Sequence, residues 1–333
     1  VDFFNTKKLG SKKIGKYRAK FLLETVNDLA CNLSQKNIPF LVRHSKTEDV
    51  FVALHKTFDI QKIFCQQEWT SEELQTEQNI SNLLPKVRWH KNYSQFLMQP
   101  QWVGSVFDKI PNLFTSFRLQ IEKVLIIRPE FDTENYHYNK SPIYVESDII
   151  SLNKLGFDDF EIDSRTAFSF AGGETQALQR LHYYFTESRQ ISQYKETRNG
   201  LLGLDYSSKF SAWLANGSIS AVTIYHELKK YESRFGANQS TYWLLFELFW
   251  RDYFKYVSMQ YKHAIFQKNG IGRLDYAIKN NLAVFQLWKD GNTDSDFINA
   301  NMLELKHTGW MSNRGRQNVA SYFCKTLHQD WRM

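Results

Sequence analysis

Hydrophobic residues near the start of the chain alternate between helical and extended spacing. The stretch 17–35 carries one apolar helical stripe, made of Phe21, Leu22, Val26, Leu29 and Leu33. A second helix is predicted over 47–57, with Val50, Phe51 and Leu54 facing inward. The apolar runs 40–42 and 60–65 follow these helices, and the second run suits a strand that is buried on both faces. This order predicts a parallel sheet with crossover helices.

Beyond residue 165 the apolar pattern is helical almost to the end of the chain. Helices are predicted there near 174–190, 207–215, 220–234, 238–264, 280–290, 295–306 and 314–327, and Gly-containing turns separate several of them. One further helix, over 114–124, is predicted at the end of the first region. Prolines and scattered polar residues interrupt every period over 126–165. We therefore expect an α/β domain over 1–125, a linker over 126–165 and an all-helical domain over 166–333.

Composition narrows the class of protein without naming a function. The 333 residues carry a net charge of +7, so an anionic partner is possible but not required. Aromatic residues make up 16% of the chain, which suits a flat cofactor, stacked bases or a helical core. The three cysteines, Cys31, Cys65 and Cys324, form no CxxC pair, which argues against a disulfide framework or a metal site and fits a reducing compartment.

The ends of the chain suggest a piece of a longer protein. The sequence does not begin with Met, and it stops at Met333 within an apparent helix. We interpret it as a fragment that is truncated at both ends. No signal peptide or membrane-spanning stretch is visible, which favours a cytoplasmic location and leaves organelle targeting open.

The run 308–323 is the most informative segment. Ser312 is a candidate N-cap, and the backbone donors of the turn after it could meet an anion. Arg314 and Arg316 flank Gly315, so the backbone could approach a ligand while the guanidinium groups reach phosphate. The alternative is an ordinary capped helix with solvated arginines.

Two further segments could carry chemistry. Consecutive hydroxyls and a lysine over 207–211 could bind a pyrophosphate, or could form a simple serine cap with an exposed lysine. In the aromatic helix 241–254, Glu247, Trp250, Arg251 and Phe254 share one face at helical spacing. Their charges need partners if they are buried, and the alternative is a core helix with a surface ion pair. By contrast, the turn Gly172-Gly173 lacks phosphate-loop spacing and is interpreted as structural.

Together these strings resemble the DNA photolyase and cryptochrome family, and the DASH-type cryptochromes most closely. The resemblance runs from about Phe3 to Met333 and implies an FAD cofactor and a folate antenna, 5,10-methenyltetrahydrofolate. It assigns flavin contacts to Tyr194, Ser207, Ser208, Lys209, Phe210, Ser211, Arg251, Asn313 and Arg316. It assigns DNA contacts to Arg198, Glu247, Trp250, Phe254, Asn313, Arg314 and Gly315, with Glu247 and Trp250 touching the damaged base.

The resemblance also raises a question about electron relay. Trp331 matches the middle tryptophan of the family's three-tryptophan relay. The outer one should fall near Ile278, where no Trp occurs and Tyr276 is the closest aromatic residue. The inner one, and part of the flavin pocket, would lie beyond Met333. We therefore expect this chain on its own to bind FAD poorly or not at all.

Three functions stay open on the sequence. The first is a monomeric, light-driven enzyme that repairs cyclobutane pyrimidine dimers in single-stranded or looped DNA by electron transfer from reduced flavin. Its activity would be that of a deoxyribodipyrimidine photo-lyase, a carbon–carbon lyase. The second is a blue-light photoreceptor with little or no repair activity. The third is an unrelated flavoprotein or nucleic-acid-binding helical domain.

Overall fold

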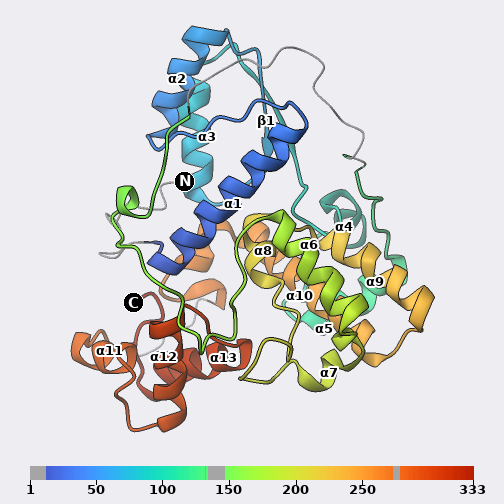
Figure 1. The fold of residues 1–333 in the computed structure, drawn as a ribbon, viewed down its shortest axis with the longest axis vertical. Coiled ribbons are helices and arrows are strands. Elements are labelled where there is room, and N and C mark those ends of the chain that lie inside the picture. The colour runs from blue at the N-terminus through green and yellow to red at the C-terminus, as the bar shows by residue number, and fades with distance from the viewer. Residues whose placement is uncertain (1–12, 132, 134–146, 273–277) are drawn as a thin grey trace.

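The computed structural model describes residues 13–131, 133, 147–272 and 278–333 (Figure 1). Its helices and strands are α1 (Lys16–Gln35), α2 (Thr47–Phe58), β1 (Lys62–Gln66), α3 (Ser71–Leu83), β2 (Arg88–Asn92), α4 (Pro100–Val106), α5 (Phe114–Ile121), α6 (Glu174–His182), α7 (Tyr194–Thr197), α8 (Ser211–Asn216), α9 (Ala221–Phe235), α10 (Gln239–Tyr261), α11 (Leu282–Lys289), α12 (Asp296–Thr308) and α13 (Asn313–Ser321). Single π turns extend α6 to Glu187 and α13 to Thr326. No helix in the described part of the chain is both long and apolar enough to cross a bilayer.

The N-terminal region is α/β, as its pattern predicts. Strands β1 and β2 pair in parallel, with Ile63 opposite Trp89 in the register. The segment between them contains α3, and Ile63 packs with Ile80 of that helix in a small core. Helices α2 and α3 lie beside the strands at one end of the molecule (Figure 1). The predicted parallel sheet with a crossover helix is therefore confirmed, whereas the prediction that the run 60–65 is buried on both faces is wrong, because Phe64 of β1 is 70% exposed.

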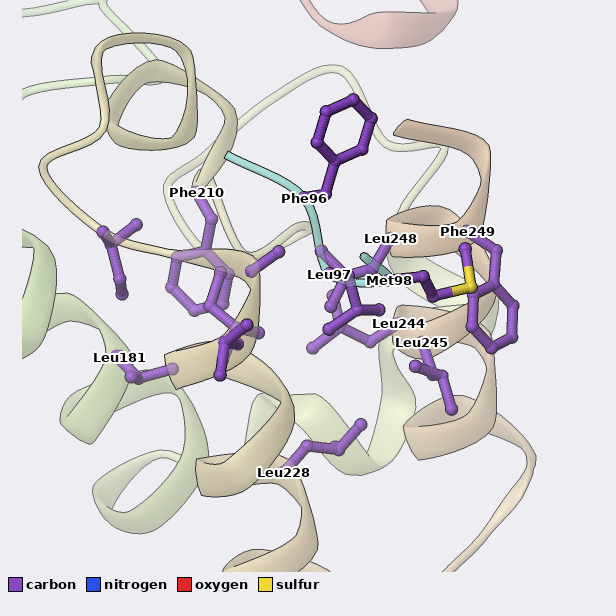
Figure 2. Packing of buried hydrophobic residues seen from close by; sticks show 14 of the residues in the cluster. Phe96, Leu97, Met98, Leu181, Phe210, Leu228, Leu244, Leu245, Leu248 and Phe249 are labelled. Atoms are coloured by element: carbon purple, nitrogen blue, oxygen red, sulfur yellow. The ribbon is translucent and has the colours of Figure 1, made fainter. Parts of the chain in front are cut away.

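The main hydrophobic core lies among the helices of the second half. It joins α6, α9 and α10 with the segment 96–121. Figure 2 shows Leu97 and Met98 beside Leu244 and Leu248 of α10. The segment 96–121 therefore shares its core with the helical region, although it precedes the predicted linker. The boundaries at 125 and 165 stay a prediction.

Capping side chains fix where several helices begin. The side chain of Asn238 accepts from the backbone N–H of Thr241, whose hydroxyl accepts from the Asn238 N–H in return. The Ser312 hydroxyl accepts from the Gly315 N–H at 2.9 Å, which confirms the predicted cap of α13. The turn Gly172-Gly173 packs on α1, where a Cβ on Gly172 would lie 2.1 Å from the Phe21 carbonyl oxygen. It has the structural role expected of it.

One predicted helix start is wrong, and four elements were not predicted. Helix α8 begins at Ser211 rather than near residue 207, because Lys209 has a left-handed backbone with φ of 66°. The segments of α3, β2, α4 and α7 carried no predicted element. Strand β2 reads Arg-Trp-His-Lys-Asn and buries little, so it lacks the apolar alternation of a typical strand.

Candidate functional site

A cavity of about 1280 Å³ lies between α1, the loop before α8, α10 and the start of α13. All nine residues that the sequence assigned to the flavin line it: Tyr194, Ser207, Ser208, Lys209, Phe210, Ser211, Arg251, Asn313 and Arg316. Arg198 and Glu247, assigned to DNA, line it as well. Segments that are far apart in the sequence thus meet at one site, although the role of each residue stays a prediction.

The loop 207–211 presents a buried lysine to this cavity. Lys209 is 2% exposed, and none of the described residues offers a hydrogen-bond partner to its Nζ. The ammonium lies 3.3 Å from the centre of the Tyr206 ring and 5.1 Å from that of Trp310. Burial, with a smaller contribution from Arg180, lowers the pKa of Lys209 to about 7. An anion entering the cavity would supply the partner that this lysine lacks.

The serines beside Lys209 leave hydroxyls available to a ligand. Ser207, Ser208 and Ser211 line the cavity, and no hydrogen bond within the described residues engages their side chains. The loop therefore combines three hydroxyl groups with an unpaired ammonium. This donor set fits a pyrophosphate group.

Helix α10 forms another wall of the cavity. Arg198 Nη1 donates to Glu247 Oε1 at 2.6 Å, so the two residues assigned to DNA are paired with each other. Burial raises the pKa of Glu247, and the neighbouring Arg198 opposes that rise. Arg251 Nη1 donates to the Gln95 carbonyl at 2.8 Å, and burial lowers the pKa of Arg251. Glu247 and Arg251 thus each have a hydrogen-bond partner, as their burial requires.

The first residues of α13 face either the cavity or the surface outside it. Asn313 and Arg316 line the cavity, whereas Arg314 does not and donates to the Asn199 side chain at 3.0 Å. Gly315 is buried, and a Cβ there would lie 2.1 Å from the Asn301 Oδ1 atom. The glycine therefore permits close packing of α13 on α12. A contact between Gly315 and DNA stays a prediction.

The remaining assigned residues lie outside the lining of the cavity. Trp250 stacks on Phe114 with ring centres 3.7 Å apart, and the ring of Phe254 lies beside it, largely exposed. Trp331 is 45% exposed. Although α10 places Glu247 and Trp250 on one broad face, only Glu247 of the two reaches the cavity.

The relay positions can be placed only in part. Tyr276 lies outside the described residues. Next to Ile278, the Lys279 carbonyl accepts from the Asp330 N–H at 3.1 Å, so the position expected for the outer tryptophan lies near the segment that contains Trp331. An isoleucine side chain cannot relay an electron there.

Sequence reasoning missed several residues of the site. Tyr206 and Trp310 flank Lys209, and Tyr17 and Phe21 of α1 close one side of the cavity. Arg180 of α6 is 4% exposed and binds the loop 204–208 from outside the cavity lining. Arg180 falls among the apolar positions Ala177 and Leu181, which was a signal that it needs buried partners.

Comparisons with known proteins identify the family. The family model described as DNA photolyase matches residues 2–134, and the one described as FAD binding domain of DNA photolyase matches residues 243–333. Cryptochrome DASH of Xenopus laevis is 40% identical over 332 residues, with 96% of this chain and 62% of the relative covered. That of Natronomonas pharaonis is 33% identical, with 99% of this chain and 70% of the relative covered. The chain belongs to the DNA photolyase family, in its cryptochrome DASH branch.

The structural comparison agrees with this membership. The crystal structure of Synechocystis cryptochrome matches with a TM-score of 0.91 at 39% identity, covering 97% of this chain and 67% of that one. The photolyase-like fold predicted from the sequence is therefore confirmed. FAD is the cofactor of the domain that residues 243–333 match. The chain spans 62–66% of the length of the cryptochrome DASH proteins from Xenopus laevis, Gloeobacter violaceus and Danio rerio.

Proposed function

We propose that this chain belongs to a blue-light-dependent FAD protein that binds DNA and repairs cyclobutane pyrimidine dimers in single-stranded or looped DNA. The observation that carries the proposal is the meeting of all nine predicted flavin residues in one cavity with Arg198 and Glu247. The same proposal includes a folate antenna, a monomeric state and a cytoplasmic location. Such an enzyme is a deoxyribodipyrimidine photo-lyase.

The cavity suits FAD by its chemistry. The buried, unpaired ammonium of Lys209 and the free serine hydroxyls match the anionic phosphates, and aromatic side chains such as Phe210 match a flat ring system. When bound and reduced, FAD supplies the electron that opens the dimer under blue light. The protein binds the cofactor, excludes water and orients the lesion.

Glu247 and Arg198 would act at the entrance for the lesion. The carboxylate of Glu247 is held by Arg198 at 2.6 Å, in a position to accept a hydrogen bond from a base edge. The guanidinium of Arg198 can contact a strand phosphate while it keeps this pair. Trp250 lies outside the cavity lining and stacks on Phe114, so it would have to leave that stack to contact the damaged base.

The test uses the complete natural chain, purified in the dark. Oligonucleotides with one defined cyclobutane dimer, single-stranded and double-stranded, are incubated with the reduced protein in blue light or darkness, and repair is measured by chromatography. Light-dependent repair of the single-stranded substrate is expected. Absence of repair on both substrates, with FAD bound, would contradict the proposal.

A photoreceptor is the second candidate, and the residue at the outer relay position favours altered photochemistry. Ile278 stands where the outer tryptophan is expected, so light-driven reduction of the flavin would follow another route. A protein that is photoreduced in the same preparation but repairs neither substrate would support this alternative.

A further inference from the structure

We infer that Arg180 is a positioning residue that shapes the loop 204–208 for the phosphate groups of the cofactor. This inference rests on the proposed FAD site. Arg180 does not line the cavity, whereas Ser207 and Ser208 do. The arginine therefore acts on the ligand through the loop rather than by direct contact.

The contacts of Arg180 are concentrated on one short segment. Its guanidinium donates to the carbonyl oxygens of Leu204 and Ser207 at 3.1 Å each, and to that of Ser208 at 3.2 Å. Nη1 also donates to the Asp205 carboxylate at 2.7 Å. Four donors of one planar group thus bind acceptors within five consecutive residues, which needs the fixed fork of an arginine.

This arrangement controls which backbone groups face the cavity. Because the carbonyl oxygens of Leu204, Ser207 and Ser208 are bound to Arg180 outside the cavity lining, their partial negative charge is kept away from an anion in the cavity. The serine side chains are left to face the ligand. The left-handed Lys209 follows directly and depends on the same loop conformation.

Arg180 is itself held in place on several sides. The side chain is 2% exposed, and its guanidinium carbon lies 4.9 Å from the ring centre of Phe170 and 5.0 Å from that of Tyr184. The Tyr183 hydroxyl donates to the second oxygen of Asp205 at 3.1 Å. The loop is therefore attached to α6 by a packed and charged unit, which is suited to preorganise a binding site.

The test is the affinity of the protein, with its flavin removed, for added FAD. In the complete natural chain, Arg180→Lys keeps the charge and loses the fork, and Arg180→Gln loses both. We expect the FAD dissociation constant to rise about tenfold or more in each variant. Asp205→Asn, which removes the negative charge from one of the four contacts and leaves the other three in place, should give a smaller rise. Amide hydrogen exchange over 204–211 should become faster in Arg180→Lys, while α9 and α10 keep their protection.

The matched control is Arg118→Lys. Arg118 also binds one carboxylate and one tyrosine hydroxyl, those of Glu122 and Tyr242, and it does not line the cavity. This variant should bind FAD like the unchanged protein. Equal FAD affinity for Arg180→Lys, Arg180→Gln and the unchanged protein would overturn the inference and leave the flavin proposal intact. Failure of the unchanged protein to bind FAD would overturn both.

Discussion

Lys209 has a charge that the fold stabilises poorly. Its pKa of about 7 lies below the ordinary 10.5, so between these values the unfolded chain binds more protons than the folded one. Folding stability should therefore rise with pH from about 7 upward, and the cost of the buried charge should be fully present below 7. Lys209→Met removes this dependence.

The measurement is urea unfolding of the flavin-free protein at pH 7, 8 and 9. The unchanged protein should gain stability relative to Lys209→Met by up to about 1.4 kcal/mol per pH unit. The exposed Lys123→Met provides a control, because its ammonium is hydrated in both states. Curves for Lys209→Met and the unchanged protein that stay parallel would contradict the prediction.

Gly315 matters because there is no room for a side chain at its position. Gly315→Ala would place a Cβ 2.1 Å from Asn301 Oδ1 and 2.9 Å from Met311 Cγ, so α13 must shift. We expect a loss of about 1–3 kcal/mol in the free energy of unfolding. In the control Gly104→Ala, nothing lies within 4 Å, and the helix α4 should gain up to about 1 kcal/mol. Denaturant titration of both variants tests the pair, and a neutral Gly315→Ala would refute the argument.

At the scale of single residues, the sequence motifs predicted which residues line the cavity, but not how those residues are buried. The motif residues Ser207, Lys209 and Arg316 line the cavity. However, the motif could not show that Lys209 is buried, because Trp310, one of the two rings that cover its ammonium, comes from a distant segment. The sequence shows which side chains can donate hydrogen bonds, whereas the groups around each donor are set by the tertiary fold.

At the scale of elements, the consequence of a cap depends on what its helix buries. Helix α10 is capped by Asn238 and buries nine residues, whereas α11 is capped by a similarly bonded Asn281 and has no fully buried residue. Asn238→Ala should therefore lower the free energy of global unfolding by about 1–2 kcal/mol. Asn281→Ala should cost less globally, because α11 can fray while the core remains folded.

Two measurements distinguish a loss of global stability in Asn238→Ala from local fraying of α11 in Asn281→Ala. Thermal unfolding reports the global cost of each variant, and amide hydrogen exchange reports local opening of α11. Equal shifts in melting temperature for the two variants would show that α11 unfolds together with the core, against the prediction.

The same dependence on burial explains which elements the sequence could predict. Helices α9 and α10 bury an apolar stripe, and α1 and α2 carry one that is mostly half-buried, with Leu29 of α1 exposed. The predicted ranges of all four helices agree with the structure to within a few residues. Helix α3 and strand β2 are polar and rest on few buried side chains, such as Ile80 and Trp89, so their periodicity is weak. Helix α4 spans seven residues, too few for a periodic signal.

At the scale of the whole molecule, the ion pair of Arg198 and Glu247 should govern binding of the DNA strand. If Arg198 contacts one phosphate, Arg198→Gln should lower the slope of log affinity against log salt by about 0.7 for single-stranded DNA. Glu247→Gln removes a repelling charge and releases Arg198. It should strengthen binding of undamaged DNA by at most about fivefold.

The two substitutions should nevertheless differ on damaged DNA. Glu247→Gln loses the carboxylate that is proposed to accept a hydrogen bond from the lesion, so its preference for dimer-containing over undamaged strands should fall even as general affinity rises. The pair Arg118 and Glu122 supplies charge-matched controls, Arg118→Gln and Glu122→Gln, at a surface outside the cavity lining. Fluorescence anisotropy over a salt series measures all four variants. If Arg198→Gln and Arg118→Gln give the same slope of log affinity against log salt concentration, the DNA strand does not contact Arg198. The proposed contact between DNA and this side of the cavity would then be wrong.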